Sequence, residues 1–307
     1  MKLLQSTLTY RIRRELASGG MGTVYEAEQF GEEGFSKRVA LKVIHPHLAG
    51  CEEFARMFVG EARLAADLVH PNIVQIYHLG RADGLFIAME LVEGLTLRDF
   101  LDLHRGQSVP LDLASFLVSR VARALEYAHR KCDPAGRPLG VVHRDVSPNN
   151  VLISSEGEVK LADFGVAKAV HYLEGPEGDR VYGRVEYMSP EQASCRQTDP
   201  RSDVYSLGVV HCELLTGVNP FLGESLSDSL SRVLSPRPVS LRPDLPGDLA
   251  AILRRCLHPD PDKRFQSAGE LAHAMEYCLY SRGYGPTIKT LADYLARLCP
   301  ERSHRAG

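Results

Sequence analysis

The first part of the chain alternates short apolar or β-branched runs with turn residues. Three such runs come before residue 45, and two more flank the turn sequence at residues 81–84. They occupy residues 10–16, 23–30, 38–44, 70–80 and 85–94. Short runs of this kind, separated by Gly, Asp and polar residues, are typical of antiparallel strands joined by turns. The pattern therefore predicts a small β-rich region at the N-terminus.

Helical spacing interrupts this region once and then dominates the rest of the chain. In residues 51–69, apolar side chains recur every three or four positions, which predicts an amphipathic helix between the third and fourth strands. Residues 113–130 give the clearest amphipathic pattern, and residues 287–299 predict a further helix beyond the main core. The Ser/Pro-rich stretch 223–248 predicts a short helix and a loop. A small β-rich lobe thus precedes a larger helical one, with a hinge near Glu90 to Gly94.

Composition limits the classes of function. The 307 residues can bury a substantial core, and 44% hydrophobic residues, 24% charged residues and a net charge of -3 indicate a globular protein without a nucleic-acid partner. Seven cysteines without a C-x-x-C pair indicate reduced thiols, and the histidines form no H-E-x-x-H motif. Polar residues follow directly after Leu3 and Leu4, so we expect no signal peptide and a cytoplasmic chain. No stretch approaches the roughly 18 apolar residues of a membrane helix.

Two candidate phosphate-binding features lie in the β-rich region. The glycine-rich sequence ASGGMGTV, residues 17–24, separates two predicted strands, where glycine lets backbone N–H groups approach a phosphate. Lys42 ends the apolar sequence VALK, and Glu61 lies on the predicted helix that follows. A buried lysine needs a carboxylate partner, and a lysine held in this way can bind phosphate oxygens. Taken singly, such features are more often an ordinary turn and a strand-end lysine that reaches for water.

The densest chemistry lies between residues 143 and 165. His143-Arg144-Asp145 is followed by Asn150, and Asp163 begins the sequence Asp-Phe-Gly. Phosphoryl transfer needs a carboxylate to accept or orient the substrate hydroxyl, and it needs oxygen ligands for Mg²⁺. Asp145 suits the first role, and Asn150 and Asp163 suit the second. The alternative, a turn or helix cap at each position, would have to hold at all of them at once.

In this order, the motifs resemble those of the eukaryotic-type (Hanks-type) serine/threonine protein kinases of bacteria, over roughly residues 9–278. The resemblance implies an α+β fold of two lobes: an N-lobe with a five-stranded antiparallel sheet and the helix that the family calls αC, and a larger, mainly helical C-lobe. It implies a kinase domain at 1–280, with its N-lobe at about 1–90, a hinge at 90–94 and its C-lobe at about 95–280. An extension with a short helix would follow at 281–307.

The resemblance also assigns roles to individual residues. Asp145 would be the catalytic base, Lys42 and Glu61 an ion pair, Asn150 and Asp163 the ligands of Mg²⁺ or Mn²⁺, and Asp203 a support of the catalytic loop. Glu191, in the sequence Ser189-Pro190-Glu191, would pair with Arg264. The positions implied for ATP share small or apolar side chains or lie in the glycine-rich turn and the hinge. They are Ala17, Gly19, Gly22, Val24, Ala40, Lys42, Met89, Glu90, Val92, Leu152 and Asp163.

Two departures from the family pattern fall beside the catalytic aspartate. Ser147 stands where the family has a lysine that neutralises the γ-phosphate, and Arg184 stands where it has a threonine. One positive charge is therefore lost and one gained at neighbouring family positions. We hypothesise that Arg184 supplies the missing cation, the alternative being an arginine of a substrate loop in solvent. Ala17 replaces the first glycine of the glycine-rich loop, and we expect a weaker ATP interaction from it.

The segment between the Asp-Phe-Gly sequence and the Ser-Pro-Glu sequence, residues 166–188, is also unusual. Arg144 marks kinases whose activation loop is ordered by phosphorylation, yet residues 166–188 contain no Ser or Thr. Acidic residues and tyrosines are present instead: Tyr172, Glu174, Glu177, Asp179 and Tyr182. We expect built-in carboxylates to pair with Arg144, with tyrosine phosphorylation or a merely solvated loop as the alternatives.

The sequence therefore predicts a bacterial signalling enzyme that transfers the γ-phosphate of Mg·ATP to Ser/Thr hydroxyls of protein substrates. Autophosphorylation is compatible with this prediction. A pseudokinase that serves as an ATP-binding scaffold is the main alternative, because the changes at Ala17, Ser147 and Arg184 could record lost chemistry. A small-molecule phosphotransferase fits less well, since those enzymes lack the Ser-Pro-Glu sequence.

Overall fold

The computed structural model describes most of the chain, in two compact units that are treated separately. It describes residues 8–82, 84–164, 184–235, 239, 241, 243–281 and 283–299, except for the side chain of Glu61. The N-terminal unit comprises the described residues up to 69 together with 74–92, and the helical unit comprises 70–73 and the described residues from 93 onward.

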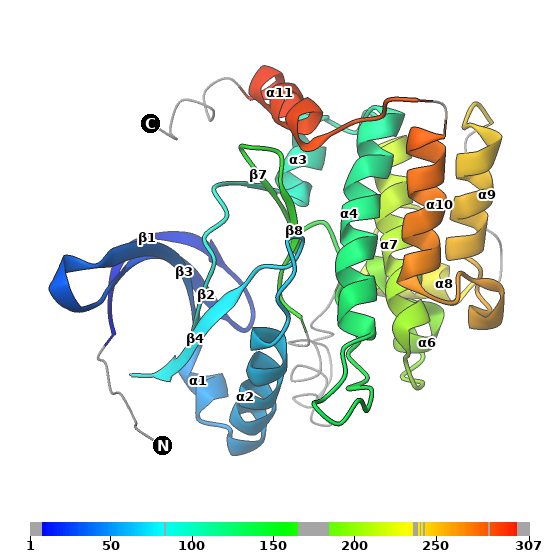
Figure 1. The fold of residues 1–307 in the computed structure, drawn as a ribbon. Coiled ribbons are helices and arrows are strands. Elements are labelled where there is room, and N and C mark those ends of the chain that lie inside the picture. Colours follow the sequence, from blue (N-terminus) through cyan, green and yellow to red (C-terminus); the bar gives the residue numbers. More distant parts are fainter. Residues whose placement is uncertain are drawn as a thin grey trace. The chain divides into compact units, whose positions relative to one another are not determined.

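The N-terminal unit is built around an antiparallel sheet with strand order β1-β2-β3-β5-β4 (Figure 1). Its strands are β1 (Thr9–Ser18), β2 (Gly22–Phe30), β3 (Ser36–Ile44), β4 (Ile76–Arg81) and β5 (Leu85–Met89). One face of the sheet buries a small apolar cluster of Ala27, Val39, Leu41 and Ala88. Tyr10, Val43 and Phe86 pack against the same cluster, and the alternation of side chains places Ala40 and Lys42 on the opposite face. The predicted five-stranded sheet is confirmed.

Short helical elements accompany the sheet. They are the 3₁₀ turn η1 (Glu32–Gly34), α1 (Pro46–Ala49) and α2 (Glu52–Ala66). Helix α2 matches the helix predicted over residues 51–69, and it buries Phe54, Phe58, Ala62 and Ala65. These positions are spaced by three or four residues, so one stripe of the helix is removed from water.

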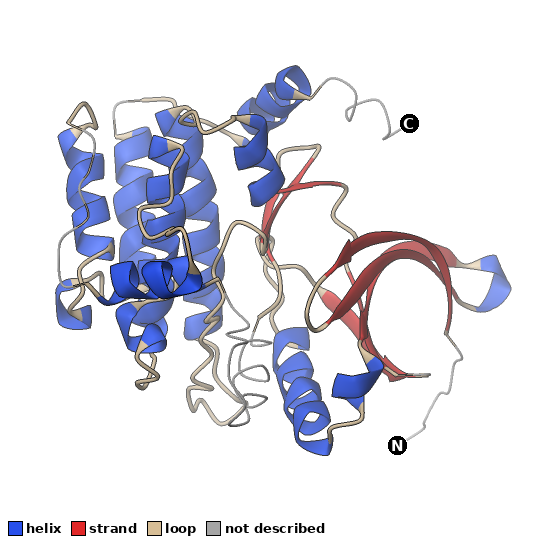
Figure 2. Cartoon of the chain, turned by 180° about the vertical axis from the view of Figure 1, so that it is seen from behind, coloured by secondary structure: helices blue, strands red, loops and turns tan. Residues whose placement is uncertain are grey.

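The helical unit contains a small three-stranded sheet and a group of packed helices (Figure 2). Its strands, in the order β6-β7-β8, are β6 (Gly94–Thr96), β7 (Val151–Ser154) and β8 (Val159–Leu161). Its helical elements are α3 (Leu97–Leu103), α4 (Leu111–His129), η2 (Val185–Tyr187), α6 (Pro190–Ala193), α7 (Pro200–Thr216), α8 (Leu226–Leu234), α9 (Gly247–Cys256), η3 (Pro261–Lys263), α10 (Ala268–Tyr280) and α11 (Ile288–Leu298).

Helix α7 forms the centre of this unit. It is buried around almost its whole circumference, from Ser202 to Leu215, and it packs against α4, α9 and α10. Asp199 caps its N-terminus, because its side chain accepts a hydrogen bond from the Arg201 amide, and Pro200 occupies the first turn. Gly217, which has a φ of 77°, caps its C-terminus. Capping aspartate, early proline and left-handed glycine are the expected boundaries of a helix.

The predicted C-terminal helix packs on the helical unit as α11. Leu291 and Leu295 are buried, and the Tyr294 hydroxyl lies 2.8 Å from His104 Nε2, next to α3. Gly157, in the turn between β7 and β8, is so close to α11 that a Cβ atom there would lie 2.1 Å from the Ile288 carbonyl oxygen. Its φ of 85° also favours glycine. The helix is therefore an integral part of this unit.

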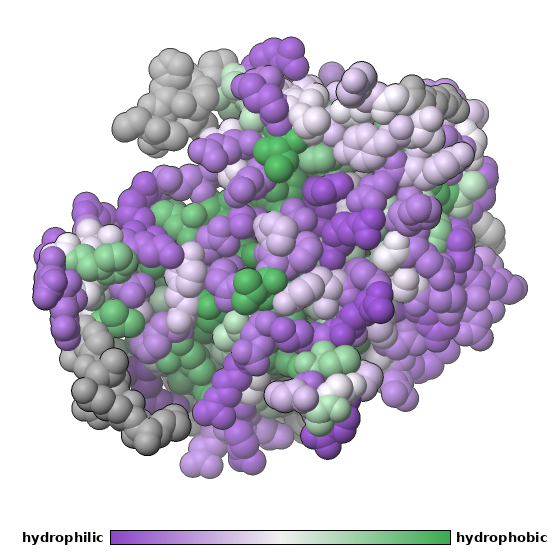
Figure 3. All heavy atoms as spheres, viewed as in Figure 1, coloured by the Kyte–Doolittle hydropathy of each residue, from purple (hydrophilic) through white to green (hydrophobic). Residues whose placement is uncertain are grey.

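The face of the helical unit seen in Figure 3 is largely polar. Figure 3 shows hydrophilic residues over most of its visible surface, as expected for amphipathic helices that turn their apolar stripes inward. Among the described residues, no helix combines the length and the apolar character required to cross a bilayer.

Candidate active site

The glycine-rich turn between β1 and β2 is held by several hydrogen bonds. The Gly19 amide donates to the Gly22 carbonyl at 3.0 Å, and the His45 amide donates to the Met21 carbonyl at 3.0 Å. His45 Nε2 lies 2.8 Å from the Gly19 carbonyl oxygen and can donate to it. At Gly22 a Cβ atom would lie 2.2 Å from the Val43 carbonyl oxygen, so no larger residue fits there without movement of the strand. Ala17, at the start of the turn, pairs with Val24.

The strand register gathers the predicted nucleotide-binding residues of the N-terminal unit on one face of its sheet. Lys42 is opposite Val24 on one side and Ile87 on the other, while Ala40 is opposite Met89. Directly opposed residues, and residues two apart on one strand, point to the same face. Lys42 is only 7% exposed. Lys42 is therefore buried beside small and apolar side chains, while the roles of these residues in binding ATP stay predictions.

The structure describes only part of the remaining residues predicted for the ATP site. Glu61 lies on α2, but its side chain is outside the described part, so its ion pair with Lys42 stays a prediction. Glu90 and Val92 follow β5, and the Glu90 amide donates to the Gln75 carbonyl at 2.8 Å. Leu152 lies on β7 of the helical unit, between Thr96 and Lys160.

In the helical unit, Asp145 is held by the asparagine five residues further on. Asn150 Nδ2 donates to the Asp145 Oδ2 atom and to the Asp145 carbonyl oxygen, both at 2.8 Å. The Asn150 amide donates to the Ser147 carbonyl at 3.0 Å, and the Ala162 amide donates to the Asn150 carbonyl at 2.8 Å. The spacing Asp-x₄-Asn thus closes a compact loop that fixes the carboxylate. Asp145 is 34% exposed, so it can reach a substrate.

Asp203 of α7 anchors the backbone of this loop. It is fully buried and accepts the backbone N–H groups of His143 and Arg144, each at 2.8 Å. His129 Nε2 donates to the same carboxylate at 2.7 Å. Burial by itself would raise the pKa of Asp203, but the hydrogen bonds and charge of His129, with those of His143, outweigh it and lower the pKa. Asp203 therefore supports the loop as a carboxylate, as predicted.

Histidine 143 connects the loop to the segment that carries Asp163. Its Nδ1 accepts the Asp145 amide at 3.2 Å, which leaves the proton on Nε2 to be donated to the Ala162 carbonyl at 2.9 Å. Its ring also meets Phe164 edge-on, with 4.6 Å between centroids. These contacts place Asp163 between two anchored neighbours. The following glycine, Gly165, lies outside the described residues.

Two residues of the site have left-handed backbone conformations. Arg144 has a φ of 65° and Asp163 a φ of 60°. Such values are uncommon outside glycine and concentrate at functional sites, where the surroundings enforce them. Arg144 Nε donates to Thr198 Oγ1 at 2.9 Å. The carboxylates predicted to pair with Arg144, together with Tyr172 and Tyr182, all lie in residues 165–183, outside the described part.

The residues that the sequence assigns to a magnesium ion, Asn150 and Asp163, carry oxygen donors. Asn150 donates from its amide nitrogen to Asp145, and the roles of Asn150 and Asp163 as ligands of the ion stay predictions. Oxygen ligands of this kind, few in number, fit a cation that keeps waters and phosphate oxygens in its shell. Among the described residues no cluster of three or more His, Cys, Asp or Glu side chains forms a closed metal site.

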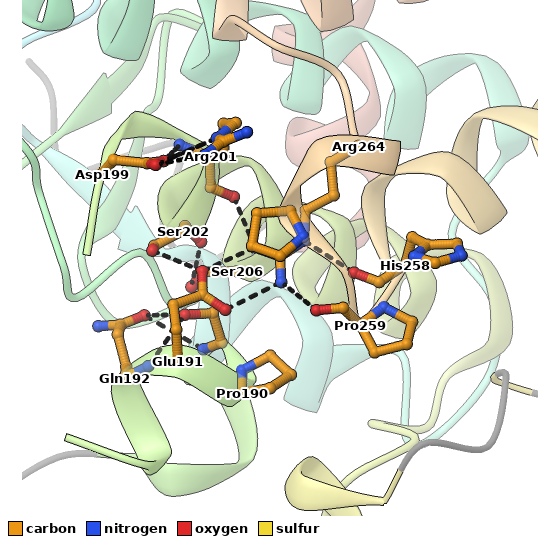
Figure 4. A network of polar contacts seen from close by, with 12 residues as sticks. Pro190, Glu191, Gln192, Asp199, Arg201, Ser202, Ser206, His258, Pro259 and Arg264 are labelled. Atoms are coloured by element: carbon orange, nitrogen blue, oxygen red, sulfur yellow. Dashed lines mark hydrogen bonds and ion pairs between the residues drawn. The ribbon is translucent and has the colours of Figure 1, made fainter. Parts of the chain in front are cut away.

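A buried ion pair fixes the Ser189-Pro190-Glu191 sequence (Figure 4). Arg264 donates from Nη1 to Glu191 Oε1 at 2.7 Å and from Nη2 to Oε2 at 2.9 Å, as predicted. Its remaining N–H groups donate to the carbonyl oxygens of His258, Pro259 and Arg201. Ser202 Oγ also donates to Glu191 at 2.7 Å. Every polar hydrogen of this fully buried guanidinium therefore has an acceptor.

Sequence reasoning missed a second buried network. Arg98 Nη2 donates to the Tyr187 hydroxyl at 2.5 Å and to Glu213 Oε1 at 2.8 Å, while the Tyr187 hydroxyl donates to Glu213 Oε2 at 2.5 Å. Burial, followed by the charge of Glu213, raises the pKa of Tyr187. Gln192 Nε2 adds a bond to the Arg144 carbonyl at 2.8 Å. No local signal links these residues, which are far apart in the chain.

The fold and this constellation are those of a phosphotransferase of the protein kinase class. The profile of the protein kinase domain matches residues 10–276, and the chain belongs to this family. A kinase-domain crystal structure of PknI from Mycobacterium tuberculosis superimposes with a TM-score of 0.65 at 33% identity, covering 87% of this chain and 94% of that one.

Curated relatives are bacterial kinases. The chain is 41% identical over 300 residues to the tyrosine-protein kinase MasK of Myxococcus xanthus, covering 95% of this chain and 46% of MasK. It is 37% identical over 273 residues to the serine/threonine-protein kinase PknA of Mycobacterium tuberculosis (87% and 60%) and 36% identical over 266 residues to PrkC of Bacillus subtilis (85% and 39%). The chain thus spans about half the length of these relatives.

Proposed function

We propose that this chain is an active protein kinase that transfers the γ-phosphate of Mg·ATP to serine or threonine hydroxyls of proteins in bacterial signalling. The observation that carries the proposal is the Asp145 carboxylate, held by Asn150 at 2.8 Å on a loop whose backbone Asp203 anchors. A carboxylate that is fixed and still accessible is what a substrate hydroxyl requires.

In the proposed reaction, the substrate hydroxyl oxygen forms a bond to the γ-phosphorus while the bond from that phosphorus to the β–γ bridging oxygen of ATP breaks. The hydroxyl proton passes to Asp145, and ADP leaves. Asn150 keeps the carboxylate oriented toward the hydroxyl. Lys42, in its buried position on β3, would bind phosphate oxygens. Magnesium held by Asn150 and Asp163 would neutralise charge on the phosphates.

The acceptor class has two candidates. PknA and PrkC are named serine/threonine kinases, whereas MasK, the relative with 41% identity, is named a tyrosine kinase. We favour Ser/Thr hydroxyls because the sequence Ser-Pro-Asn-Asn after Asp145 does not resemble the catalytic loop of tyrosine kinases. A cytoplasmic location stays a prediction.

Transfer of labelled phosphate tests the proposal. The protein would be incubated with [γ-³²P]ATP and Mg²⁺, alone and with basic protein substrates, beside Asp145→Asn and Asp163→Ala variants. We expect phosphoserine or phosphothreonine that both variants abolish. Label only on tyrosine would correct the acceptor class, and ATP binding without any label would establish a scaffold.

A further inference from the structure

The catalytic loop lacks a cation where transfer of a charged group calls for one. Ser147 is fully buried, and its Oγ has no hydrogen-bond partner among the described residues. A serine cannot neutralise phosphate charge. Phosphoryl transfer depends on positioned positive charge, so an active enzyme of this sequence would gain from a cation near Asp145 in addition to Lys42 and magnesium.

Among the described residues, Arg184 forms the ion pair with Asp145. Its Nη2 atom lies 3.9 Å from Asp145 Oδ2, within ion-pair range but too far for a hydrogen bond. That oxygen instead accepts Asn150 Nδ2 at 2.8 Å. Arg184 Nε is buried without a hydrogen-bond partner among the described residues, while the side chain as a whole is 33% exposed. The guanidinium thus lies next to the catalytic carboxylate but forms no hydrogen bond with it.

The backbone that carries Arg184 is firmly held. The Tyr187 amide donates to the Arg184 carbonyl at 2.9 Å, which closes the η2 turn. The Tyr187 hydroxyl is bound by Arg98 of α3 and Glu213 of α7, in the buried network described above. An arginine on a fixed turn loses less freedom on binding a ligand than one on a free loop.

The same segment is connected to the catalytic loop. Gln192 takes part in a capping box with Ser189 at the start of α6, and its Nε2 also donates to the Arg144 carbonyl at 2.8 Å. Arg144 directly precedes Asp145. The segment that carries Arg184 is therefore linked by a hydrogen bond to the loop that carries Asp145.

We propose that Arg184 binds the transferring phosphoryl group and replaces the lysine that Ser147 has displaced, so that the phosphate-binding cation comes from the segment anchored by Tyr187. The inference rests on the proposed kinase function. Its chemistry is that of a fork of N–H donors, which matches phosphate oxygens better than a single ammonium group does. The cation is then in place only when residues 184–193 adopt this arrangement.

An exchange of the two positions gives the sharpest test. Four proteins would be compared by steady-state kinetics with Mg·ATP and by ATP binding: wild type, Arg184→Ala, Arg184→Thr, and Arg184→Thr combined with Ser147→Lys. We expect kcat to fall about 100-fold or more in both single variants, with ATP affinity much less affected. The double variant should regain at least about tenfold of the loss, because the lysine returns the charge. Arg254→Ala, an exposed arginine on α9, is the matched control and should leave kcat unchanged.

The outcomes separate this inference from the proposed function. An active wild type whose Arg184→Ala variant keeps kcat within about twofold overturns the role of Arg184 alone. Loss of kcat without recovery in the double variant, with thermal stability and ATP binding intact, overturns the replacement of the lysine. No phosphate transfer by the wild type overturns the kinase proposal itself, and the inference with it.

Discussion

Replacing Arg264 by methionine should destabilise the helical unit strongly. The change removes a guanidinium whose side chain is 0% exposed and leaves Glu191, 9% exposed, with Ser202 as its remaining side-chain partner. Breaking a buried ion pair on one side typically costs about 3–5 kcal/mol, because an uncompensated charge stays behind. We expect a loss of this size, which is a large part of the usual stability of a domain.

The assay is denaturant unfolding at neutral pH, followed by far-UV circular dichroism because the chain has no tryptophan. Arg232→Met is the control: its ion pair with Asp228 is at 3.0 Å, but both side chains are well exposed, so a loss of at most about 1 kcal/mol is expected. Glu191→Met combined with Arg264→Met should recover part of the loss, because no charge remains unpaired. An Arg264 variant as stable as the control would refute the reasoning.

The pH dependence gives an independent check on the same pair. Burial by itself would raise the pKa of Glu191, but the hydrogen bonds and charge of Arg264 outweigh it and lower the pKa. The pair therefore contributes stability above the ordinary glutamate pKa of 4.5, and this contribution is lost as the pH falls through the lowered pKa. The difference in unfolding free energy between wild type and Arg264→Met should narrow in acid. A constant difference from pH 7 down to the acid transition would contradict this.

Two further substitutions test the anchoring of the catalytic loop and the packing of α11. Asp203→Asn removes the negative charge of a carboxylate that accepts hydrogen bonds from two backbone amides and from His129. We expect kcat to fall at least about tenfold and the free energy of unfolding to fall by about 1–3 kcal/mol. Wild-type values of both would argue against the anchoring role. Leu291→Ala, at a fully buried position of α11, should cost about 2–5 kcal/mol in thermal unfolding and expose α11 to limited proteolysis, whereas Lys289→Ala on its exposed face should do neither.

Elements with a one-sided apolar pattern could be predicted from the sequence, and others could not. Residues 113–130 have a clear apolar stripe, and the helix is found as α4, Leu111–His129. Helix α7 has no such stripe because it is buried on nearly all sides, so periodicity could not reveal it. Strand β6 was also not predicted. It is only three residues long, and its partner β7 lies far along the chain, so its pairing leaves no local pattern.

The site divides along the same lines. Asp145 and Asn150 lie five residues apart, so their hydrogen bond follows from a short motif that the sequence displays. Tyr187 and Glu213 meet only through the tertiary fold, and Arg98 joins them from 89 and 115 residues away. A charged residue on a predicted helix is ordinarily assigned to the surface, because burial without a partner is unfavourable. Only the fold shows that these charges have partners.

The strained backbone at Arg144 explains why so many distant residues converge on one loop. A left-handed conformation costs a non-glycine residue about 1–3 kcal/mol, so it persists only where surrounding bonds enforce it. Asp203 accepts the amides of His143 and Arg144, and Gln192 donates to the Arg144 carbonyl. Hydrogen bonds to a charged group are worth about 1.5–3 kcal/mol each, so the two bonds to Asp203 can offset the strain. The direction of the Asp145 carboxylate therefore depends on α7 and α6, and damage to either should reduce phosphate transfer even where every catalytic side chain is intact.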